Sequence, residues 1–254
     1  MTKRICVSGA SSGIGARIAV DLAADGGDLV LIARRKDQLD EVAAQALAAG
    51  AASTTVVVLD LATPDDVLPT LRPLTETGPF DVVVAAAGAN AALAPSAPAG
   101  LEGLAWATWH WEANFRANVM TAVTLLEGLR ELDAIADQAS ITLLSSIAAY
   151  RGSGSGSYGA SKAALHPYAY DLADALGTRG VRVNVVAPGY IAETGFFNGQ
   201  LSSQRHETLI SQTLIGRAGT PEDVSGTVQW LSSPQARHVT GQIIQINGGA
   251  SLGR

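Results

Sequence analysis

Short apolar runs alternate with helical patterns along the chain. Seven runs have the length and composition of buried strands, and they cover residues 4–8, 29–33, 55–59, 81–86, 141–145, 181–187 and 242–246. Helical periodicity appears between them, at residues 16–24, 36–49, 109–129, 157–176 and 221–231. The strand runs lack polar alternation, which is typical of strands that are covered by helices on both faces. This order predicts an α/β fold with three layers, a doubly wound parallel sheet of the Rossmann-like kind.

The composition fits one domain. The chain has 254 residues, of which 47% are hydrophobic, and this is enough for one large core. No linker, repeat or charge block divides it, so we expect a single domain over residues 1–254. No apolar stretch approaches the ~20 residues needed to cross a bilayer, and we expect a cytoplasmic protein. The formal net charge of −6, without a local cluster of Lys and Arg, argues against nucleic acid and anionic membranes as partners.

Cysteine and histidine usage argues against disulfide and metal sites. The single cysteine, Cys6, lies in the first predicted strand and is interpreted as buried packing. The four histidines show no spacing typical of a metal site, so none is predicted. His166 is expected at the surface or at an interface.

A glycine-rich turn follows the first predicted strand and leads into the first helix. Its spacing, Gly9-x-x-x-Gly13-x-Gly15, differs from the common Gly-x-Gly-x-x-Gly fingerprint. Glycines let the backbone approach a pyrophosphate closely, Ser11 and Ser12 offer hydroxyl groups, and a helix N-terminus offers free N–H groups. The turn is interpreted as a phosphate-binding loop, with a tight turn beneath the helix as the alternative.

Tyr158 and Lys162 lie four residues apart in a helical pattern, so their side chains are expected on one face. A cation near a phenol favours the ionised form and lowers the phenol's pKa by roughly 1–3 units. Such a pair exchanges protons closer to neutral pH than a free tyrosine does. In isolation, the same spacing is more typical of a solvated pair on a helix surface, so the rest of the chain must decide.

Taken together, these motifs resemble the short-chain dehydrogenase/reductase family nearly from end to end. The resemblance rests on the glycine turn, Asn118, the Ser145-Ser146 pair, Tyr158-x-x-x-Lys162 and Pro188-Gly189. Two motifs near the C-terminus extend it, residues 216–223 and the segment that ends in Asn247-Gly248-Gly249.

The resemblance implies four catalytic residues. Tyr158 would exchange the proton with the substrate oxygen, and Lys162 would hold the nicotinamide ribose and lower the pKa of the tyrosine. Ser146, twelve residues before Tyr158, would polarise the carbonyl, with Ser145 as the rival. Asn118 would hold a water in the proton relay. Its rival, Asn114, is expected at the surface.

The resemblance also implies a dinucleotide site. The second predicted strand ends in Ala33-Arg34-Arg35, where an NAD-binding fold often has an acid, and Arg34 therefore favours NADP(H) over NAD(H). Asp60 and Leu61 match the position beside the adenine, although Asp60 also suits a helix cap. The other residues implied at this site are Gly9, Ser11, Ser12, Gly13, Ile14, Gly15, Ala87, Gly88, Tyr158, Lys162, Pro188, Gly189, Ile191 and Thr194.

Two stretches depart from the family pattern. Residues 85–88 are Ala-Ala-Ala-Gly where the family usually has Asn-Asn-Ala-Gly, so the amide that ties neighbouring strands is missing and local rigidity is in doubt. Thr194, expected to contact the nicotinamide carboxamide, arrives one residue late after Pro188-Gly189.

The sequence therefore predicts an NADP(H)-dependent oxidoreductase that interconverts a carbonyl and a secondary alcohol by hydride transfer. A substrate loop over about residues 189–215 is rich in apolar residues, and the tail motifs resemble those of 3-oxoacyl-thioester reductases among others.

Aromatic residues on the helices at 109–129 and 157–176 predict a homotetramer, or a homodimer. The alternative function is a non-catalytic nucleotide-binding regulator of the same fold, favoured only by the alanines at residues 85–87. A serine hydrolase is not favoured, because no histidine and aspartate partners are placed for a nucleophilic serine.

Overall fold

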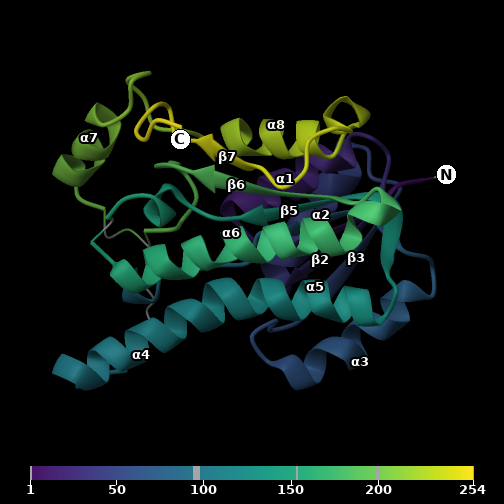
Figure 1. Cartoon of the computed structure of the whole chain (residues 1–254), viewed down its shortest axis with the longest axis horizontal. Coiled ribbons are helices and arrows are strands. Elements are labelled where there is room, and N and C mark those ends of the chain that lie inside the picture. The colour runs from purple at the N-terminus through teal and green to yellow at the C-terminus, as the bar shows by residue number, and fades with distance from the viewer. Residues whose placement is uncertain (1, 94–97, 153, 198, 200, 254) are drawn as a thin grey trace.

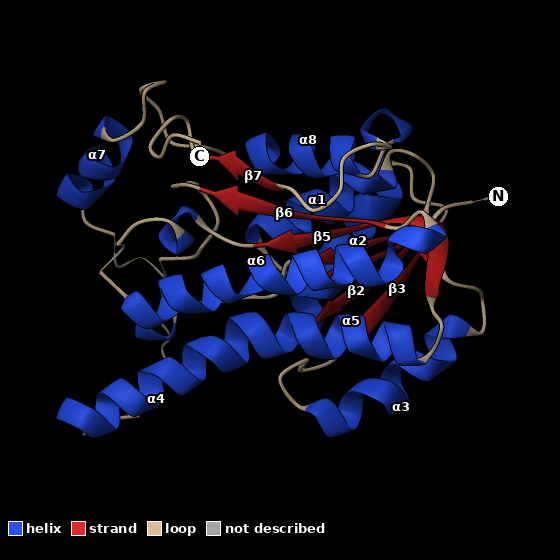
Figure 2. Ribbon diagram, viewed as in Figure 1, coloured by secondary structure: helices blue, strands red, loops and turns tan. Residues whose placement is uncertain are grey.

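A single parallel sheet forms the centre of the molecule. The computed structural model describes residues 2–93, 98–152, 154–197, 199 and 201–253, and within them seven strands are ordered β3-β2-β1-β4-β5-β6-β7 (Figure 2). The strands are β1 (Arg4–Ser8), β2 (Asp28–Ala33), β3 (Ser53–Val58), β4 (Phe80–Ala85), β5 (Ile135–Leu144), β6 (Arg182–Pro188) and β7 (Ile243–Ile246). All neighbouring pairs are parallel.

Helices cover both faces of this sheet. They are α1 (Gly13–Ala23), α2 (Lys36–Ala49), α3 (Pro64–Thr75), α4 (Gly103–Phe115), α5 (Thr121–Glu131), α6 (Gly156–Leu176), α7 (Ser203–Ser211) and α8 (Pro221–Leu231). Helices α1, α2 and α8 pack on one face around Ile18, Leu39 and Val228. Helices α3, α5 and α6 pack on the other around Leu71 and Leu125. Figure 1 shows the two helical layers with the sheet between them, so the predicted three-layer Rossmann-like architecture is confirmed.

The main differences from the sequence prediction concern β5, the helix predicted over residues 109–129, and two helices that were not predicted. Strand β5 begins at Ile135, six residues before the predicted start at residue 141. The predicted helix 109–129 is divided into α4, a π-helical turn η2 (Arg116–Met120) and α5. Helices α3 and α7 were not predicted, because α3 contains Pro69 and Pro73 and α7 has no buried residue to give an apolar stripe.

The sheet order places the candidate site residues of the sequence at one edge. The chain starts at β1, moves outward through β2 and β3, and then returns to β4 on the other side of β1. Ligands of such folds bind beyond the carboxyl ends of the strands, where the strand order reverses. The glycine turn, residues 86–88, the serine pair and Pro188-Gly189 follow β1, β4, β5 and β6, and they meet at this edge.

Candidate active site

Tyr158 lies in the first turn of α6 with 8% of its surface exposed. A side-chain hydrogen bond joins its phenol to Ser146. Burial raises the pKa of Tyr158 to about 12, and the Ser146 hydrogen bond acts in the opposite direction with less weight. The expected lowering of this pKa is therefore wrong for the protein alone, because desolvation of a phenolate outweighs the favourable contacts.

Lys162 lies one turn further along α6 and is 5% exposed. Its Nζ donates a hydrogen bond to the carbonyl oxygen of Leu144, at the end of β5, over 2.9 Å. Burial lowers the pKa of Lys162 to about 8. Gly88 approaches this ammonium so closely that a Cβ atom there would lie 2.8 Å from Nζ and 2.7 Å from Asn118 Oδ1. A side chain at residue 88 would thus displace two of the predicted catalytic groups.

The two serines after β5 have different partners. Ser145 is buried, and its Oγ lies 2.9 Å from the carbonyl oxygen of Lys162 and 2.8 Å from His166 Nε2. Ser146 instead faces Tyr158 and accepts a backbone hydrogen bond from Ala148 over 3.2 Å. The structure thus brings Ser146 to the phenol, while Ser145 fastens α6 to the sheet. His166, expected at the surface or an interface, is half-buried in this contact.

Asn118 lies in the π-helical turn η2 and is fully buried. Its Nδ2 donates to the carbonyl oxygen of Ala89 over 2.8 Å and to Ser161 Oγ over 3.1 Å, and its Oδ1 accepts from the Ala89 N–H over 3.0 Å. These contacts hold the segment after β4 against α6. Asn114, expected at the surface, is also fully buried; that expectation is wrong because the last turn of α4 packs against α6.

The glycine turn connects β1 to α1 as predicted. Gly9 and Gly13 have φ of 67° and 54°, a region that favours glycine. A Cβ at Gly9 would lie 2.7 Å from the backbone nitrogen of Ala87, and one at Gly15 would overlap the carbonyl of Gly9. Packing within the protein therefore requires Gly9 and Gly15. Ile14 is half-buried in the first turn of α1, and Ser12, the N-cap, makes no capping hydrogen bond with its side chain.

A serine supplies the hydrogen bonds that replace those of the asparagines missing after β4. Ser8 is fully buried at the end of β1. Its hydroxyl accepts from the Ala87 N–H over 3.3 Å and donates to the Val84 carbonyl over 3.5 Å. The backbone of residues 84–87 is thus fixed to β1 without the usual asparagines. Sequence reasoning missed Ser8, whose only signal was a polar residue at the end of an apolar strand.

The two arginines after β2 also differ. Arg35 donates from Nη2 to Ser11 Oγ over 3.0 Å and to Ser12 Oγ over 2.8 Å, which brings its guanidinium to the glycine turn. Arg34, the predicted residue, is exposed beside it. The strand pattern did not determine which of the two arginines would reach the glycine turn, so Arg35 was not singled out.

The residues after β3 have structural partners. Asp60 accepts a hydrogen bond from the Ala62 N–H over 3.0 Å, forming a turn that precedes α3. Leu61 is 3% exposed and packs in the core. Asp60 thus stabilises the turn before α3 and does not cap the helix, whose N-cap is Thr63.

The segment after β6 approaches the glycine turn. Gly189 donates its N–H to the Ile246 carbonyl over 2.8 Å, which fixes the end of β6 at Pro188 to β7. Ile191 is buried and pairs with Gly219. A Cβ at Gly13 would lie 2.9 Å from the carbonyl oxygen of Thr194. Thr194 and the glycine turn therefore lie against each other, as a shared dinucleotide site requires.

An aromatic chain continues from Tyr158 into the predicted substrate loop. The ring of Phe196 lies 5.7 Å from that of Tyr158, and Phe197 lies 5.2 Å from Phe196 and 5.9 Å from Tyr190. Tyr190 closes the chain with a 2.6 Å hydrogen bond between its hydroxyl and His206 Nδ1 on α7. We call residues 189–215 the lid; residues 198 and 200 of this range lie outside the described residues. A cavity of about 190 Å³ is enclosed by residues of the lid between Tyr190 and Leu201.

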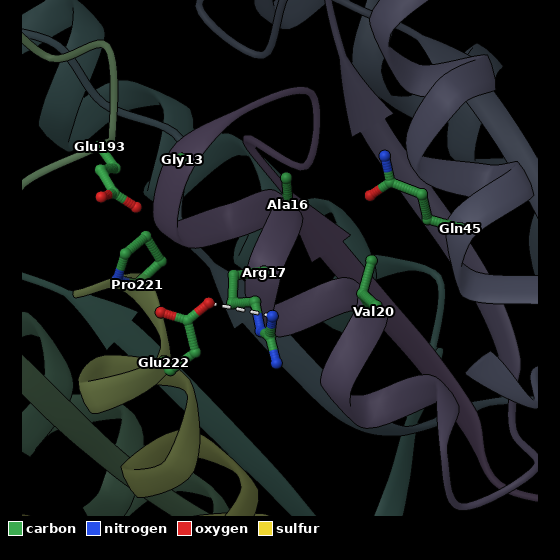
Figure 3. A pocket seen from close by; sticks show the side chains of 8 residues that line it. All are labelled: Gly13, Ala16, Arg17, Val20, Gln45, Glu193, Pro221 and Glu222. Carbon is green, nitrogen blue, oxygen red and sulfur yellow. Dashed lines mark ion pairs between the residues drawn. The ribbon is translucent and has the colours of Figure 1, made fainter. Parts of the chain in front are cut away.

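A second cavity, of about 270 Å³, lies on the outer side of α1. It is lined by Gly13, Ala16, Arg17, Val20, Gln45, Glu193, Pro221 and Glu222 (Figure 3). Arg17 points across it to Glu222, with an ion pair of 2.9 Å. None of the predicted catalytic residues lines this cavity, so it is separate from the reaction site.

In the described part of the chain, none of the helices combines the length and the apolar composition that a membrane span needs. No group of three or more His, Cys, Asp or Glu side chains there is placed to hold a metal ion.

Comparison with known proteins decides the family. A family model described as enoyl-(acyl carrier protein) reductase matches residues 9–251. Galactitol 2-dehydrogenase (L-tagatose-forming) of Cereibacter sphaeroides is 32% identical over 256 residues, covering 97% of this chain and 94% of that protein. The chain belongs to the short-chain dehydrogenase/reductase family. A 3-oxoacyl-[acyl-carrier-protein] reductase of Staphylococcus aureus is 28% identical and covers 98% of both chains.

Solved structures agree with this assignment. A short-chain dehydrogenase/reductase of Brucella melitensis, described as glucose/ribitol dehydrogenase, superposes with a TM-score of 0.83 at 31% identity, covering 99% of this chain and 97% of that one. A family member from Burkholderia cenocepacia, in complex with NADP, gives 0.84 at 28% identity and covers 98% and 97%. The protein is thus an oxidoreductase of the short-chain dehydrogenase/reductase family, acting between alcohols and carbonyl compounds.

Proposed function

We propose that this short-chain dehydrogenase/reductase interconverts a carbonyl compound and a secondary alcohol with NADP(H), and that Tyr158 transfers the proton. The observation that carries the proposal is the buried Tyr158 phenol, hydrogen-bonded to Ser146 and one helical turn from the Lys162 ammonium. A neutral phenol beside a hydroxyl donor and a cation is suited to give a proton to an oxygen that becomes negative.

Each of the proposed catalytic residues has a separate role in the reaction. When bound, the nicotinamide group supplies the hydride for reduction and accepts it in oxidation. In the reduction direction, Ser146 donates a hydrogen bond to the carbonyl oxygen, and Tyr158 gives its proton to the same oxygen. The product alcohol therefore gains one hydride at carbon and one proton at oxygen. Lys162 stabilises the phenolate left behind, and Asn118 holds the backbone beside Lys162.

The residues at the sheet edge fit a dinucleotide. The glycine turn offers backbone N–H groups at the N-terminus of α1, where the Ser12 side chain does not cap them. Gly88, Lys162 and Thr194 would hold the nicotinamide half, while Asp60 and Leu61 would lie on the adenine side. Arg35 provides a cation beside Ser11 and Ser12 for a 2′-phosphate, and Arg34 is an exposed cation at the preceding position. NADP in the Burkholderia cenocepacia relative and NADPH in a 28% identical metagenomic blue fluorescent protein support this preference.

The lid supports an apolar substrate. Phe196 extends from the ring of Tyr158 toward Phe197 and Tyr190, so the group attached to a carbonyl at Tyr158 would meet aromatic surface. Apolar pockets with few polar groups bind such compounds by burial. The relatives are named for a sugar alcohol and for a 3-oxoacyl thioester, and the aromatic lid favours the less polar of these two classes.

Exposed aromatic residues on the helical face support an oligomer. Trp111, Phe115 and Tyr170 of α4 and α6 are 49%, 36% and 47% exposed, and aromatic residues are enriched in interface cores. We propose a homotetramer or homodimer that buries this face. Light scattering at micromolar concentration tests this, and the mass of a single chain would refute it.

The non-catalytic alternative loses its main support. It was favoured by the alanines after β4, but Ser8 fastens that segment to β1, and the reactive side chains are all present. The site therefore favours a catalytic role over a regulatory one.

A screen of ketones and secondary alcohols with both nicotinamide cofactors tests the proposed function. Absorbance of the reduced cofactor should change with apolar carbonyl compounds and NADPH. Tyr158→Phe should lower kcat by more than about 10³-fold, since it removes the proton donor, and should leave NADPH affinity within about threefold. Equal turnover by the wild type and Tyr158→Phe would refute the mechanism.

A further inference from the structure

Two parallel rungs of hydrogen bonds join α4 and η2 to α6. Asn118 Nδ2 donates to Ser161 Oγ over 3.1 Å, and one turn earlier Asn114 Nδ2 donates to Ser157 Oγ over 2.9 Å. The two carboxamide oxygens also act alike. Oδ1 of Asn118 accepts from the Ala89 N–H over 3.0 Å, and Oδ1 of Asn114 accepts from the Ala91 N–H over 3.1 Å. Each asparagine therefore ties the loop after β4 to α6.

His110 completes the second rung. Its Nε2 lies 3.2 Å from Asn114 Nδ2, and its Nδ1 lies 3.0 Å from Ser157 Oγ. The amide nitrogen acts only as a donor, and it also donates to the His110 carbonyl oxygen over 3.0 Å. Burial lowers the pKa of His110, which favours the neutral ring. The ring stacks on Trp106 at 4.5 Å.

The second rung is as buried as the first. His110, Asn114 and Ser157 are 5%, 0% and 2% exposed. Hydrogen bonds among such groups are costly to leave unmade, because a buried polar atom that loses its partner is not rehydrated. The rung therefore fixes the positions of the three side chains and of the backbone to which they are attached.

Both ends of this rung lie next to reacting groups. Ser157 directly precedes Tyr158 in the first turn of α6, so its side chain fixes the backbone from which the phenol projects. Ala91 belongs to the loop that carries Gly88, which lies against Lys162 and Asn118. A displacement of about 1 Å at a reacting group can cost a factor of about 10² in rate.

We propose that Asn114 is a positioning residue of the active site, which acts on Tyr158 through Ser157 and on the cofactor-binding loop through Ala91. The proposal rests on the proposed function, because it assumes that Tyr158 transfers the proton and that the loop at Gly88 contacts the dinucleotide. His110 orients the Asn114 and Ser157 side chains, and Asn114 thereby adds a second tie for a loop that lacks the usual asparagines.

Two variants distinguish the effect of Asn114 on Tyr158, which acts through Ser157, from its effect on the loop, which acts through Ala91. Ser157→Ala removes the arm toward Tyr158 alone, and kcat should fall about tenfold, as for a modest loss of alignment, with the Kd for NADPH unchanged. Asn114→Leu removes both arms, so kcat should fall about 30-fold and the Kd for NADPH should rise about fivefold, in line with the loss of one to two hydrogen bonds. Combining the two variants should give less than the product of their effects on kcat, because both act through one contact.

Ser140→Ala is the matched control. Ser140 is also 2% exposed, and its Oγ donates one hydrogen bond, to the Leu231 carbonyl, far from the site. It should leave kcat and Kd within about twofold while lowering the melting temperature. The decrease should be smaller than in Ser157→Ala, because Ser140 loses one hydrogen bond whereas Ser157 loses its contacts with Asn114 and His110.

The readouts distinguish failure of this proposal from failure of the proposed function. Cofactor titration by fluorescence requires no turnover, so an unchanged Kd in Asn114→Leu overturns the arm through Ala91. A wild-type kcat in Ser157→Ala, measured per cofactor-binding site, overturns the arm through Tyr158, and this variant suffices if Asn114→Leu does not fold. If the wild type and Tyr158→Phe turn over equally, the proposed function fails, whereas the affinity change in Asn114→Leu still supports its role at the loop.

Discussion

The wall that carries Tyr158 and the lid that faces it are built in different ways. Ser145, Tyr158 and Lys162 are at most 8% exposed, and they are hydrogen-bonded to α6, to Ser146 and to β5, respectively. Helix α7 of the lid has no buried residue, and the lid contacts the wall through the ring of Phe196. The wall therefore fixes the position of the proton, and the lid determines which substituents a substrate can carry.

Electrostatics sharpens this contrast. In the wall, burial moves both titrating groups toward their neutral forms, raising the pKa of Tyr158 and lowering that of Lys162. Holding these groups out of water costs stability and keeps a proton available for transfer. The lid carries aromatic rings instead, so its variants should change substrate selection more than the chemical step.

After the loss expected for Tyr158→Phe, the next largest effect is expected for the serines that follow β5. Ser146→Ala should lower kcat by about 10²–10³-fold, because it removes a donor to the developing oxyanion. Ser145→Ala should lower kcat by less than about tenfold, since Ser145 bonds to α6 and not to Tyr158. Steady-state kinetics of the two variants checks this, and a larger loss in Ser145→Ala would assign the carbonyl contact to the wrong serine.

Stability should reveal the cost of burying Lys162. Its pKa is about 8 in the folded protein and 10.5 normally, so between these values the unfolded chain holds a proton that the folded chain lacks. The free energy of unfolding should therefore rise with pH across this window, with the full deficit present below pH 8. Lys162→Met should be about 1–2 kcal/mol more stable than the wild type at pH 7, after allowance for the lost bond to Leu144.

Urea unfolding of both proteins at about pH 7 and pH 10 measures this difference. Other titrating groups are shared, so their contributions cancel when the variant is subtracted. The difference should shrink at the higher pH. A wild type that is the more stable protein by the same amount at both values would show that Lys162 is not strained by burial.

Variants of Arg34 and Arg35 test the proposed preference for NADPH over NADH. Arg35→Ala should raise the KM for NADPH about tenfold and the KM for NADH by less than about threefold, as expected for one charge-assisted contact to a 2′-phosphate. Arg34→Asp should also raise the KM for NADPH and should improve the use of NADH. Kinetics with both cofactors decides, and equal losses with NADPH and NADH in both variants would indicate a structural role for the pair.

The smallest effect is expected in the lid. Phe196→Ala should raise the KM for a bulky apolar ketone about fivefold, because it removes aromatic contact area, and should leave kcat within about threefold. A ketone too small to reach the ring serves as the control and should be unaffected. A large fall in kcat with both ketones would place Phe196 in the fixed wall.

The sequence predicted the fold because the fold depends on local patterns, and the same patterns singled out the candidate site residues. Apolar runs located all seven strands, and the spacing of Tyr158, Lys162 and Ser146 along the chain matched their arrangement in space. Contacts between distant segments were not predictable. Ser8 with Ala87, Arg35 with Ser11 and Asn114 with Ser157 each join residues at least 24 positions apart, and no periodicity records which side chain turns inward.

The direction of the pKa shift of Tyr158 was predicted wrongly for a similar reason. The spacing of Tyr158 and Lys162 indicated a cation near the phenol, but it did not indicate how deeply both groups would be buried. Desolvation depends on every segment packed over the pair, and for Tyr158 it outweighs the hydrogen bond from Ser146.

The pH dependence of alcohol oxidation tests most directly whether the buried phenol of Tyr158 handles the proton. Oxidation needs the phenolate, and the raised pKa of Tyr158 keeps the phenol protonated at neutral pH. With NADP as the oxidant, kcat/KM should therefore climb from about pH 6 to pH 9, by up to about tenfold per unit, while carbonyl reduction stays nearly constant below pH 8. Tyr158→Phe should show neither activity. An oxidation profile that is flat over this range, or one that persists in Tyr158→Phe, would contradict the account.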